Sequence, residues 1–336
     1  MNAPSEANLP VVVYGAGSWG TTLAILLGRQ GRDVLLWARD AAWRRELLRD
    51  RENRKYLPGF PFPASLRVAS QDAMPGPGGA AVVIATPSHG VRPLLESLRG
   101  TTSGAWILAA KGLEESTSRR MSEVHAEVLP SEASKVAVLT GPTLAREVAE
   151  GKPAALLVAS NDVAVAETVQ RLFSSDRFRV YTSDDLVGVE LAGALKNVIA
   201  LAAGMADGLE LGQNARGALL TRGLAEMRRL GEALGAKGET FLGLSGMGDL
   251  VTTCTSPLSR NHTLGESLGR GVPLERALAG SIMVAEGVRT THAALRLASK
   301  LSVELPITAQ VARILRGEAD APSALRELMT RPLRPE

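Results

Sequence analysis

The run Val11-Val-Val-Tyr14 is followed directly by Gly15-Ala-Gly-Ser-Trp-Gly20, and a helical pattern continues from there. The first four residues are apolar and mostly β-branched, which is typical of a buried strand. In the G-x-G-x-x-G spacing, Gly15 permits a tight turn, Gly17 lets a ligand approach the backbone, and Gly20 lets the helix pack against the strand. The stretch therefore predicts the first strand–helix unit of a layered α/β fold.

The first half of the chain repeats this alternation. Strands that are apolar on both faces indicate a parallel sheet covered by helices on both sides. The predicted strands are Pro10–Tyr14, Asp33–Trp37, Leu66–Ala69, Ala80–Ala85, Ala105–Ala110, Val136–Thr140, Ala154–Ala159 and Arg177–Tyr181, with helices such as Ser18–Arg29, Ser88–Leu98 and Val163–Phe173 between them. This order predicts a Rossmann-like, doubly wound and mostly parallel sheet. Asn53–Pro63, with three prolines and a glycine, is expected to cross the surface as a loop.

After about Ser183 the strand patterns end and helical spacing continues to the C-terminus. Helices are predicted at Asp185–Gly204, Arg216–Leu234, Arg260–Gly269, Ser281–Lys300 and Ile307–Arg316. A chain of 336 residues is long enough for two domains. We therefore predict a dinucleotide-binding Rossmann-like domain at 1–183 and an all-helical, substrate-binding C-terminal domain at 184–336.

The glycine pattern and the end of the second strand together predict a dinucleotide cofactor. The free N–H groups at the start of the helix, aided by the helix dipole, would face a pyrophosphate. Where an NAD enzyme carries an acid for the ribose 2′-hydroxyl, this chain has Arg39, and a guanidinium can pair with a 2′-phosphate. Asp40 could instead cap the next helix. The sequence favours NADPH, with NADH as a possible alternative.

Several polar groups stand where a small anionic substrate could bind. Lys111 and Gly141-Pro-Thr143 follow predicted strands, at the edge where open α/β sheets bind ligands. Lys196 lies among apolar residues of a long helix and therefore needs a partner. Asp249, in a glycine-rich loop, could pair with it or cap the helix that follows. Ser259-Arg260-Asn261 is either a phosphate site at a helix start or an ordinary cap.

Composition excludes some classes and disfavours others. Cys254 is the only cysteine, so an internal disulfide and a cysteine metal cluster are excluded, and the four scattered histidines do not support a metal site. The net charge is only +3, and no basic block interleaved with aromatics indicates nucleic-acid binding. The N-terminus lacks a signal-peptide pattern. The most apolar stretch, Leu191–Met205, is interrupted by Lys196 and Asn197 and is expected to be too short to span a bilayer. We expect a cytoplasmic protein without membrane insertion.

Seven motifs, in order, resemble those of the bacterial NAD(P)-dependent glycerol-3-phosphate dehydrogenases. The resemblance extends from Val11 to about Ile314 and rests on GAGSWGT at 15–21, AAKGLE at 109–114, GPT at 141–143, ELAGALKN at 190–197, GMGDL at 246–250, SRN at 259–261 and AEGVRT at 285–290. Seven motifs in one order make the match specific.

The resemblance implies the site residues and the reaction. Besides the glycine loop, cofactor contacts would fall on Ser18, Trp19, Arg39, Lys111, Ala145, Arg260, Val284 and Glu286. Substrate contacts would fall on Lys111, Gly141, Thr143, Lys196, Asp249, Ser259, Arg260 and Asn261. The resemblance implies reduction of dihydroxyacetone phosphate to sn-glycerol 3-phosphate with Lys196 as acid/base, in supply of glycerophospholipid synthesis. A homodimer is the default assembly for such enzymes.

Two alternatives remain. One is a related dehydrogenase acting on a 3-hydroxy acid or a sugar phosphate; the arginine at 260 disfavours a plain hydroxy acid, and the lack of a catalytic cysteine motif disfavours a nucleotide-sugar oxidiser. The other is a sensor that binds NADPH without turnover. A sensor predicts loss of Lys196 or Asp249, and both are present.

Overall fold

The structure is a computed structural model that describes residues 10–70, 74–279 and 285–333. The chain divides into two compact units. The first comprises Met1–Ala110 and Met121–Leu186, and the second comprises Lys111–Arg120 and Val187–Glu336. The predicted domain boundary at 183 and 184 stays a prediction. The division of the structure adds that the short segment Lys111–Arg120 groups with the helical second unit.

The first unit is built on an eight-stranded sheet of order β3-β2-β1-β4-β5-β6-β7-β8. Its strands are β1 Val11–Tyr14, β2 Val34–Trp37, β3 Leu66–Val68, β4 Ala81–Ile84, β5 Ala105–Leu108, β6 Val136–Thr140, β7 Ala154–Ala159 and β8 Phe178–Ser183. Neighbouring strands pair in parallel except β6 and β7, which are antiparallel. The predicted strands are confirmed, and so is the mostly parallel, doubly wound fold class.

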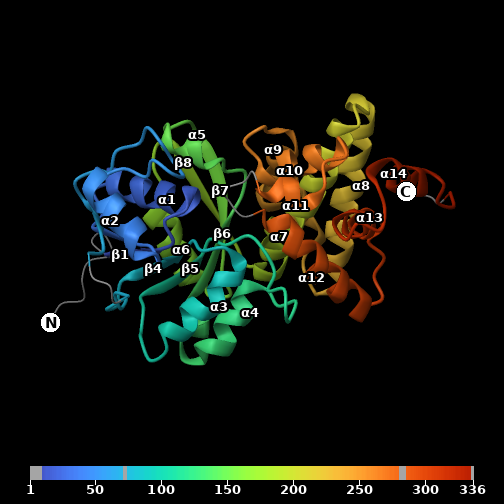
Figure 1. Cartoon of the computed structure of the whole chain (residues 1–336). Helices are drawn as coiled ribbons and strands as arrows, with labels where there is room; N and C mark the ends of the chain where they lie inside the picture. The colour runs from blue at the N-terminus through green and yellow to red at the C-terminus, as the bar shows by residue number, and fades with distance from the viewer. Residues whose placement is uncertain (1–9, 71–73, 280–284, 334–336) are drawn as a thin grey trace. The chain divides into compact units, whose positions relative to one another are not determined.

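Helices cover both faces of this sheet. They are α1 Ser18–Arg29, α2 Ala41–Asp50, α3 Ser88–Ser97, α4 Met121–Val128, α5 Ala145–Ala149 and α6 Val163–Phe173, with a 3-10 turn at Pro130–Lys135. Strand order runs outward in one direction from β1 and in the other from β4, so right-handed crossovers place helices on opposite faces. Helix α1 contacts α5 and α6, whereas α3 and α4 pack together (Figure 1). In sheets of this kind ligands bind at the carboxyl ends of the strands where the order reverses, which here are β1 and β4.

The segment Asn53–Pro63 differs from expectation. It contains no helix or strand, as its prolines predict, but it does not lie wholly on the surface. Leu57, Phe60 and Phe62 are buried in the core of the first unit. The prolines keep the backbone irregular, while the apolar side chains between them supply enough buried area to anchor the loop.

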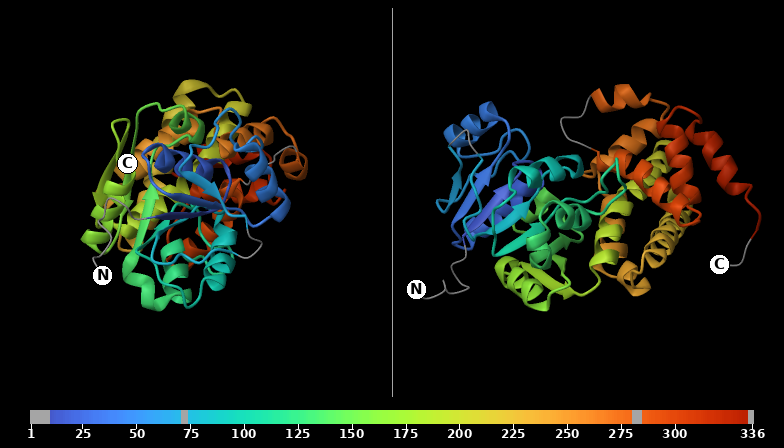
Figure 2. Two further views of the ribbon diagram at one scale, coloured as in Figure 1. Left: turned by 90° about the vertical axis from the view of Figure 1, so that its left-hand side faces the viewer. Right: turned by 90° about the horizontal axis from the view of Figure 1, so that it is seen from below.

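From α7 onward the described residues form helices joined by loops, drawn from yellow-green to red in Figure 2. The elements are α7 Leu186–Gly208, α8 Gly212–Ala233, α9 Asp249–Thr255, α10 Arg260–Gly269, α11 Leu274–Ala279, α12 Glu286–Lys300, α13 Pro306–Leu315 and α14 Ala321–Met329, with short turns at Gly238–Leu242 (η3) and Leu244–Gly248 (η4). The beginning of the helix predicted at Ser281–Lys300 lies outside the described residues. The all-helical C-terminal region is confirmed.

Helix α7 is the central element of the second unit. Its 23 residues are long and apolar enough to cross a membrane, so the expectation that this stretch is too short was wrong. However, 94% of its most apolar window is buried within the fold, as in the core helix of a soluble protein. Its apolarity is explained by the neighbouring helices that surround it.

Helices α7 and α10 approach each other at backbone contact distance. A Cβ atom added to Gly204 would lie 2.0 Å from the carbonyl oxygen of His262, and one added to Gly265 would lie 2.1 Å from that of Leu201. Only glycine, which has no Cβ, permits this approach. The crossing fixes the first turns of α10 against the C-terminal half of α7.

Candidate active site

The glycine loop of the first unit meets the backbone requirements for binding a pyrophosphate. Gly15 has φ of 115°, and a Cβ there would lie 2.7 Å from the backbone of Ala85 after β4. A Cβ on Gly20 would lie 1.9 Å from the carbonyl oxygen of Gly15, so this glycine allows the helix to pack on the loop. A Cβ on Gly17 would meet nothing within 4 Å, which leaves open space beside the helix start. The loop therefore fits a dinucleotide, although each predicted contact stays a prediction.

The N-terminus of α1 is open to an anion. Gly17 is the N-cap, without a side-chain hydrogen bond, and the first intrahelical bond joins the N–H of Thr21 to the carbonyl of Gly17. The N–H groups of Ser18, Trp19 and Gly20 have no intrahelical acceptor and can face a phosphate.

Asn53 braces this loop, and the sequence analysis did not identify it. Its side chain is fully buried, and its Nδ2 donates to the carbonyl of Ala16 at 2.9 Å and to Oγ1 of Thr21 at 2.7 Å. A single asparagine at the start of a proline-rich loop carries no signal for this role. The bonds hold the glycine loop and the first turn of α1 in one arrangement.

The end of β2 leaves one arginine exposed. Asp40 caps α2 by accepting the N–H of Trp43 at 2.6 Å, so the capping alternative for Asp40 is confirmed. Buried Arg44 donates to the carbonyls of Ala38 and Arg39 at 2.7 and 3.0 Å and fixes the backbone after the strand. The Arg39 side chain is itself exposed, as a contact for a 2′-phosphate requires.

The turn after β6 also requires glycine. Gly141 has φ of 144°, and a Cβ there would lie 2.9 Å from the Cα of Leu156. Thr143 donates its hydroxyl to the carbonyl of Gly141 at 3.1 Å. Ala145 begins α5, and its carbonyl accepts the hydroxyl of Thr22 in α1 at 3.1 Å. The three predicted contacts Gly141, Thr143 and Ala145 thus share one turn that is tied to the helix of the glycine loop.

The second unit contains a buried cluster of two lysines, one aspartate and one threonine, which we call the lysine cluster. Lys196 in α7 is 5% exposed, and its Nζ lies 2.5 Å from Oδ1 of Asp249 and 2.7 Å from Oγ1 of Thr253. The other carboxylate oxygen of Asp249 accepts Nζ of Lys111 at 2.8 Å. Of the two alternatives for Asp249, the structure shows the pairing with Lys196 and gives no side-chain capping bond at the start of α9.

The lysine cluster carries excess positive charge and a perturbed ammonium. Burial lowers the pKa of Lys196 to about 8; Lys111 lowers it too, while Asp249 acts in the opposite direction. A lysine that exchanges its proton near neutral pH suits acid/base chemistry. Two ammonium groups share one carboxylate, so the cluster as a whole favours an anionic ligand.

A chain of amide hydrogen bonds connects this cluster to two other elements of the same unit. Asn197 donates to the carbonyl of Lys111 at 3.0 Å, and Asn261 donates to Oδ1 of Asn197 at 2.9 Å. The oxygen of the Asn261 amide accepts the N–H of Gly287 in α12 at 2.9 Å. Asn197 was not predicted as a site residue, although it follows Lys196 directly in the quoted motif. Asn261, predicted to contact substrate, already uses its amide oxygen and one amide hydrogen within the unit.

The start of α10 has the features of both alternatives that the sequence left open, an ordinary helix cap and a phosphate site. Ser259 is the N-cap, and its hydroxyl accepts the N–H of His262 at 3.3 Å. The next residue, Arg260, is exposed at the first helical position. The imidazole of His262 lies 2.7 Å from Asp207, which fastens the first turn to α7. Glu286 begins α12, and Val284, the remaining predicted contact, lies outside the described residues.

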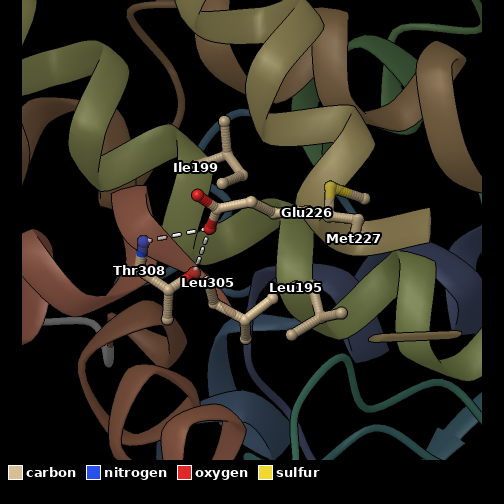
Figure 3. Close-up of a pocket in the computed structure, with 6 residues that line it drawn as sticks. All are labelled: Leu195, Ile199, Glu226, Met227, Leu305 and Thr308. Atoms are coloured by element: carbon tan, nitrogen blue, oxygen red, sulfur yellow. Dashed lines mark hydrogen bonds between the residues drawn. The ribbon is translucent and has the colours of Figure 1, made fainter. Parts of the chain in front are cut away.

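Two other buried groups have structural roles. Burial raises the pKa of the Cys254 thiol to about 12, so it is not a nucleophile at neutral pH. Glu226 in α8 caps α13 by accepting the N–H groups of Ile307 and Thr308 and the hydroxyl of Thr308, within a small, mostly apolar hollow (Figure 3).

Among the described residues no group of three or more His, Cys, Asp or Glu is placed to hold a metal ion.

These features define a class of protein: a dehydrogenase with a Rossmann-like nucleotide fold and a helical C-terminal region that carries a buried lysine. The chain belongs to the NAD-dependent glycerol-3-phosphate dehydrogenase family, whose N-terminal model matches residues 10–166 and whose C-terminal model matches residues 185–326. The family expected from the sequence motifs is confirmed.

Individual relatives match over nearly the whole chain. The glycerol-3-phosphate dehydrogenase (NAD(P)+) of Geobacter sulfurreducens is 50% identical over 96% of this chain and 98% of its own length. The protein of the same name from Syntrophotalea carbinolica is 51% identical over 96% and 98%. The crystal structure of glycerol-3-phosphate dehydrogenase from Coxiella burnetii superposes with a TM-score of 0.90 at 39% identity, covering 97% of this chain and 100% of that one.

Proposed function

We propose that this protein reduces dihydroxyacetone phosphate to sn-glycerol 3-phosphate, with NADPH preferred and NADH as an alternative. The observation that carries the proposal is the buried lysine cluster, in which Lys196 is held by Asp249 and Thr253. In this proposal residues 1–183 bind the dinucleotide and 184–336 bind the substrate, with Lys111 contributing to both. The bound, reduced nicotinamide supplies a hydride to the ketone carbon.

Lys196 acts as the general acid. As the ketone carbon is reduced, negative charge develops on its oxygen; Lys196 stabilises that charge by hydrogen bonding and then donates its proton. Asp249 orients the ammonium groups of both Lys196 and Lys111 through its two oxygens. Lys111 positions the ligands and adds positive charge, without a change in its bonds.

The phosphate of the substrate binds at the start of α10. The helix N-terminus offers N–H groups and a favourable dipole, and the Arg260 guanidinium adds charge-assisted hydrogen bonds beside Ser259 and Asn261. Binding energy from the phosphate helps to hold a three-carbon substrate in place. Gly141 and Thr143 complete the proposed substrate contacts.

The proposed cofactor contacts come from several of the motifs quoted above. The proposed set is Gly15, Gly17, Ser18, Trp19, Gly20, Arg39, Lys111, Ala145, Arg260, Val284 and Glu286. We further propose a cytoplasmic homodimer that supplies glycerophospholipid synthesis, in keeping with the family to which the chain belongs.

The experiment is the Lys196→Ala variant, assayed by NADPH oxidation with dihydroxyacetone phosphate. We expect kcat to fall about 10²- to 10⁴-fold, the usual contribution of a general acid, while the Kd for NADPH changes less than about twofold. Lys300→Ala, at the exposed end of α12, is the matched control and should be silent. Near-normal turnover by Lys196→Ala would remove Lys196 from the role.

A substrate panel tests the reaction itself. Phosphorylated and free ketones are compared with 3-oxo acids under the same conditions. We expect dihydroxyacetone phosphate to give the highest kcat/KM, because the start of α10 recognises a phosphate. Faster reduction of an unphosphorylated 3-oxo acid would favour the hydroxy-acid alternative, and NADPH binding without turnover of any ketone would favour the sensor.

A further inference from the structure

The segment Lys111–Arg120, which we call the strap, has an arrangement that the family resemblance did not predict. It groups with the helical unit although the residues on either side in sequence belong to the sheet unit. Its ends are drawn together by a bridge between Leu113 and Arg120 and by a bond from the N–H of Glu114 to the carbonyl of Arg119 at 2.9 Å. Leu113 is 1% exposed and lies in the core of the helical unit.

Besides the pair of Lys111 with Asp249, two further ion pairs join the strap to helices of this unit. Arg120 lies 3.0 Å from Glu190 of α7, with side chains 14% and 6% exposed. Arg289 of α12 lies 2.8 Å from Glu115, and both of these side chains are 42% exposed. The first pair is largely removed from solvent and is expected to hold its geometry, whereas the second is a surface pair of small energetic effect.

The contacts of the strap place both of its ends on one face of α7. Glu190 and Asn197 are seven residues apart, close to two helical turns, so their side chains project from the same face about 10 Å apart along the axis. Glu190 binds Arg120 at one end of the strap, and Asn197 binds the carbonyl of Lys111 at the other. A shift of the Arg120 end is therefore transmitted through the bridged strap to Lys111.

We propose that Arg120 and Glu190 are positioning residues, whose ion pair holds the strap on α7 so that Lys111 stays on Asp249 opposite Lys196. This inference rests on the proposed function of the lysine cluster. Neither Arg120 nor Glu190 touches the reacting atoms in this proposal. They act by fixing the separation of the two ammonium groups that share the Asp249 carboxylate.

The position of the strap has a measurable electrostatic consequence. The charged or titratable groups that bear on Lys196 are Asp249 and Cys254 of α9 and Lys111 of the strap. Lys111 lowers the pKa of Lys196, so a strap that moves away from α7 allows this pKa to rise. The alkaline limb of the reductive pH profile, where Lys196 loses its proton, then moves to higher pH.

The test compares Arg120→Met and Glu190→Gln with Arg289→Met and Glu115→Gln, the matched controls at the exposed pair of the same strap. We expect the first two to lower kcat/KM for dihydroxyacetone phosphate by about tenfold or more, since misplacement of a positioned group by about 1 Å has large effects. Their alkaline limb should move upward, and the Kd for NADPH should rise, because Lys111 is also a proposed cofactor contact. The control variants should leave all three quantities unchanged.

Conservative variants keep the proposal testable if the truncations do not fold. Arg120→Lys retains the charge but loses the planar fork, and it should shift the same quantities in the same direction by less. The exchange Arg120→Glu with Glu190→Arg should restore part of the loss. Folded variants with a lowered Tm but unchanged kcat/KM and an unmoved alkaline limb would show a merely structural pair and overturn the proposal.

The same experiments separate failure of this inference from failure of the proposed function. Lys111→Met removes the charge directly and should shift the alkaline limb by at least as much as Arg120→Met. If Lys196→Ala and Lys111→Met both leave turnover unchanged, the proposed function fails. If they abolish or alter turnover while the Arg120 and Glu190 variants are silent, only the positioning role is refuted.

Discussion

Replacement of Gly204 by alanine should uncouple the start of α10 from the lysine cluster. The added Cβ would lie 2.0 Å from the carbonyl oxygen of His262, about 1.4 Å short of the 3.4 Å at which ordinary contact begins. A backbone oxygen has no rotamer to change, so the helices must separate. Residue 262 directly follows the proposed phosphate contacts Ser259–Asn261, so these residues move with it.

The magnitude follows from that displacement. A shift of about 1 Å in a positioned group reduces the rate by about 100-fold, so kcat/KM for dihydroxyacetone phosphate should fall by roughly this factor. Overpacking of a close helix crossing also destabilises the fold by about 1–3 kcal/mol. Because Arg260 is also a proposed cofactor contact and moves with the start of α10, the Kd for NADPH should rise as well, although the glycine loop itself is untouched.

Gly217→Ala is the matched control. Gly217 is an exposed position inside α8, and a Cβ there would meet nothing within 4 Å. This variant should keep full activity and gain about 0.5–1 kcal/mol in stability from the better helix propensity of alanine. Steady-state kinetics, fluorescence titration with NADPH and urea unfolding would be measured for both. A folded Gly204→Ala protein with kcat/KM within twofold of the parent would refute the reasoning.

Three further predictions concern pH and cofactor choice. Because the pKa of Lys196 is lowered to about 8, the rate of ketone reduction should fall about tenfold for each pH unit above that value, and the rate of the reverse oxidation should rise. A reductive rate that stays constant up to about pH 9.5 would contradict this. Burial lowers the pKa of His125 from 6.5 to about 4, so between these values the unfolded chain binds a proton that the folded protein does not. The free energy of unfolding should therefore fall by about 1.4 kcal/mol for each pH unit below 6.5, and the total loss should reach about 3 kcal/mol near pH 4. His125→Phe should remove that loss in urea unfolding at pH 7 and about 4.5, and an unchanged acid dependence would exclude His125 as its source. Arg39→Ala should raise KM for NADPH about tenfold or more and leave KM for NADH within about twofold, and equal effects on both cofactors would argue against a 2′-phosphate contact.

The sheet and the glycine loop could be predicted because their signals are local. Strands buried on both faces are apolar throughout, and the roles of Gly15 and Gly20 follow from the spacing of three glycines. The bounds of the short helices α9 and α11, of seven and six residues, were not predicted, although a helix after Asp249 was expected. Segments of that length contain too few turns for a helical period to be recognised.

The lysine cluster could be predicted only in part. A lysine inside an apolar helix requires a counter-charge, and this physical requirement suggested the pair of Lys196 with Asp249, 53 residues away. Nothing comparable indicated that Lys111 binds the same carboxylate from 138 residues away, or that Asn53 supports the glycine loop. Such contacts depend on the tertiary fold. Likewise, no hydrophobic pattern in the sequence of the strap indicates that it packs with the helical unit.

The sharing of Asp249 by two lysines explains why the substrate should be an anion. A carboxylate that pairs with one buried ammonium satisfies it, and little driving force for ligand binding remains. Here a single carboxylate faces Lys196 and Lys111 in a site where water screens charge poorly, so one positive charge is left over. That charge is unfavourable in the free protein and is offset when a ligand brings negative charge, most of all when charge develops on the ketone oxygen during reduction. Neutralising Lys111 should therefore weaken stabilisation of the transition state more than binding of the ground state, and kcat should fall by a larger factor than KM rises.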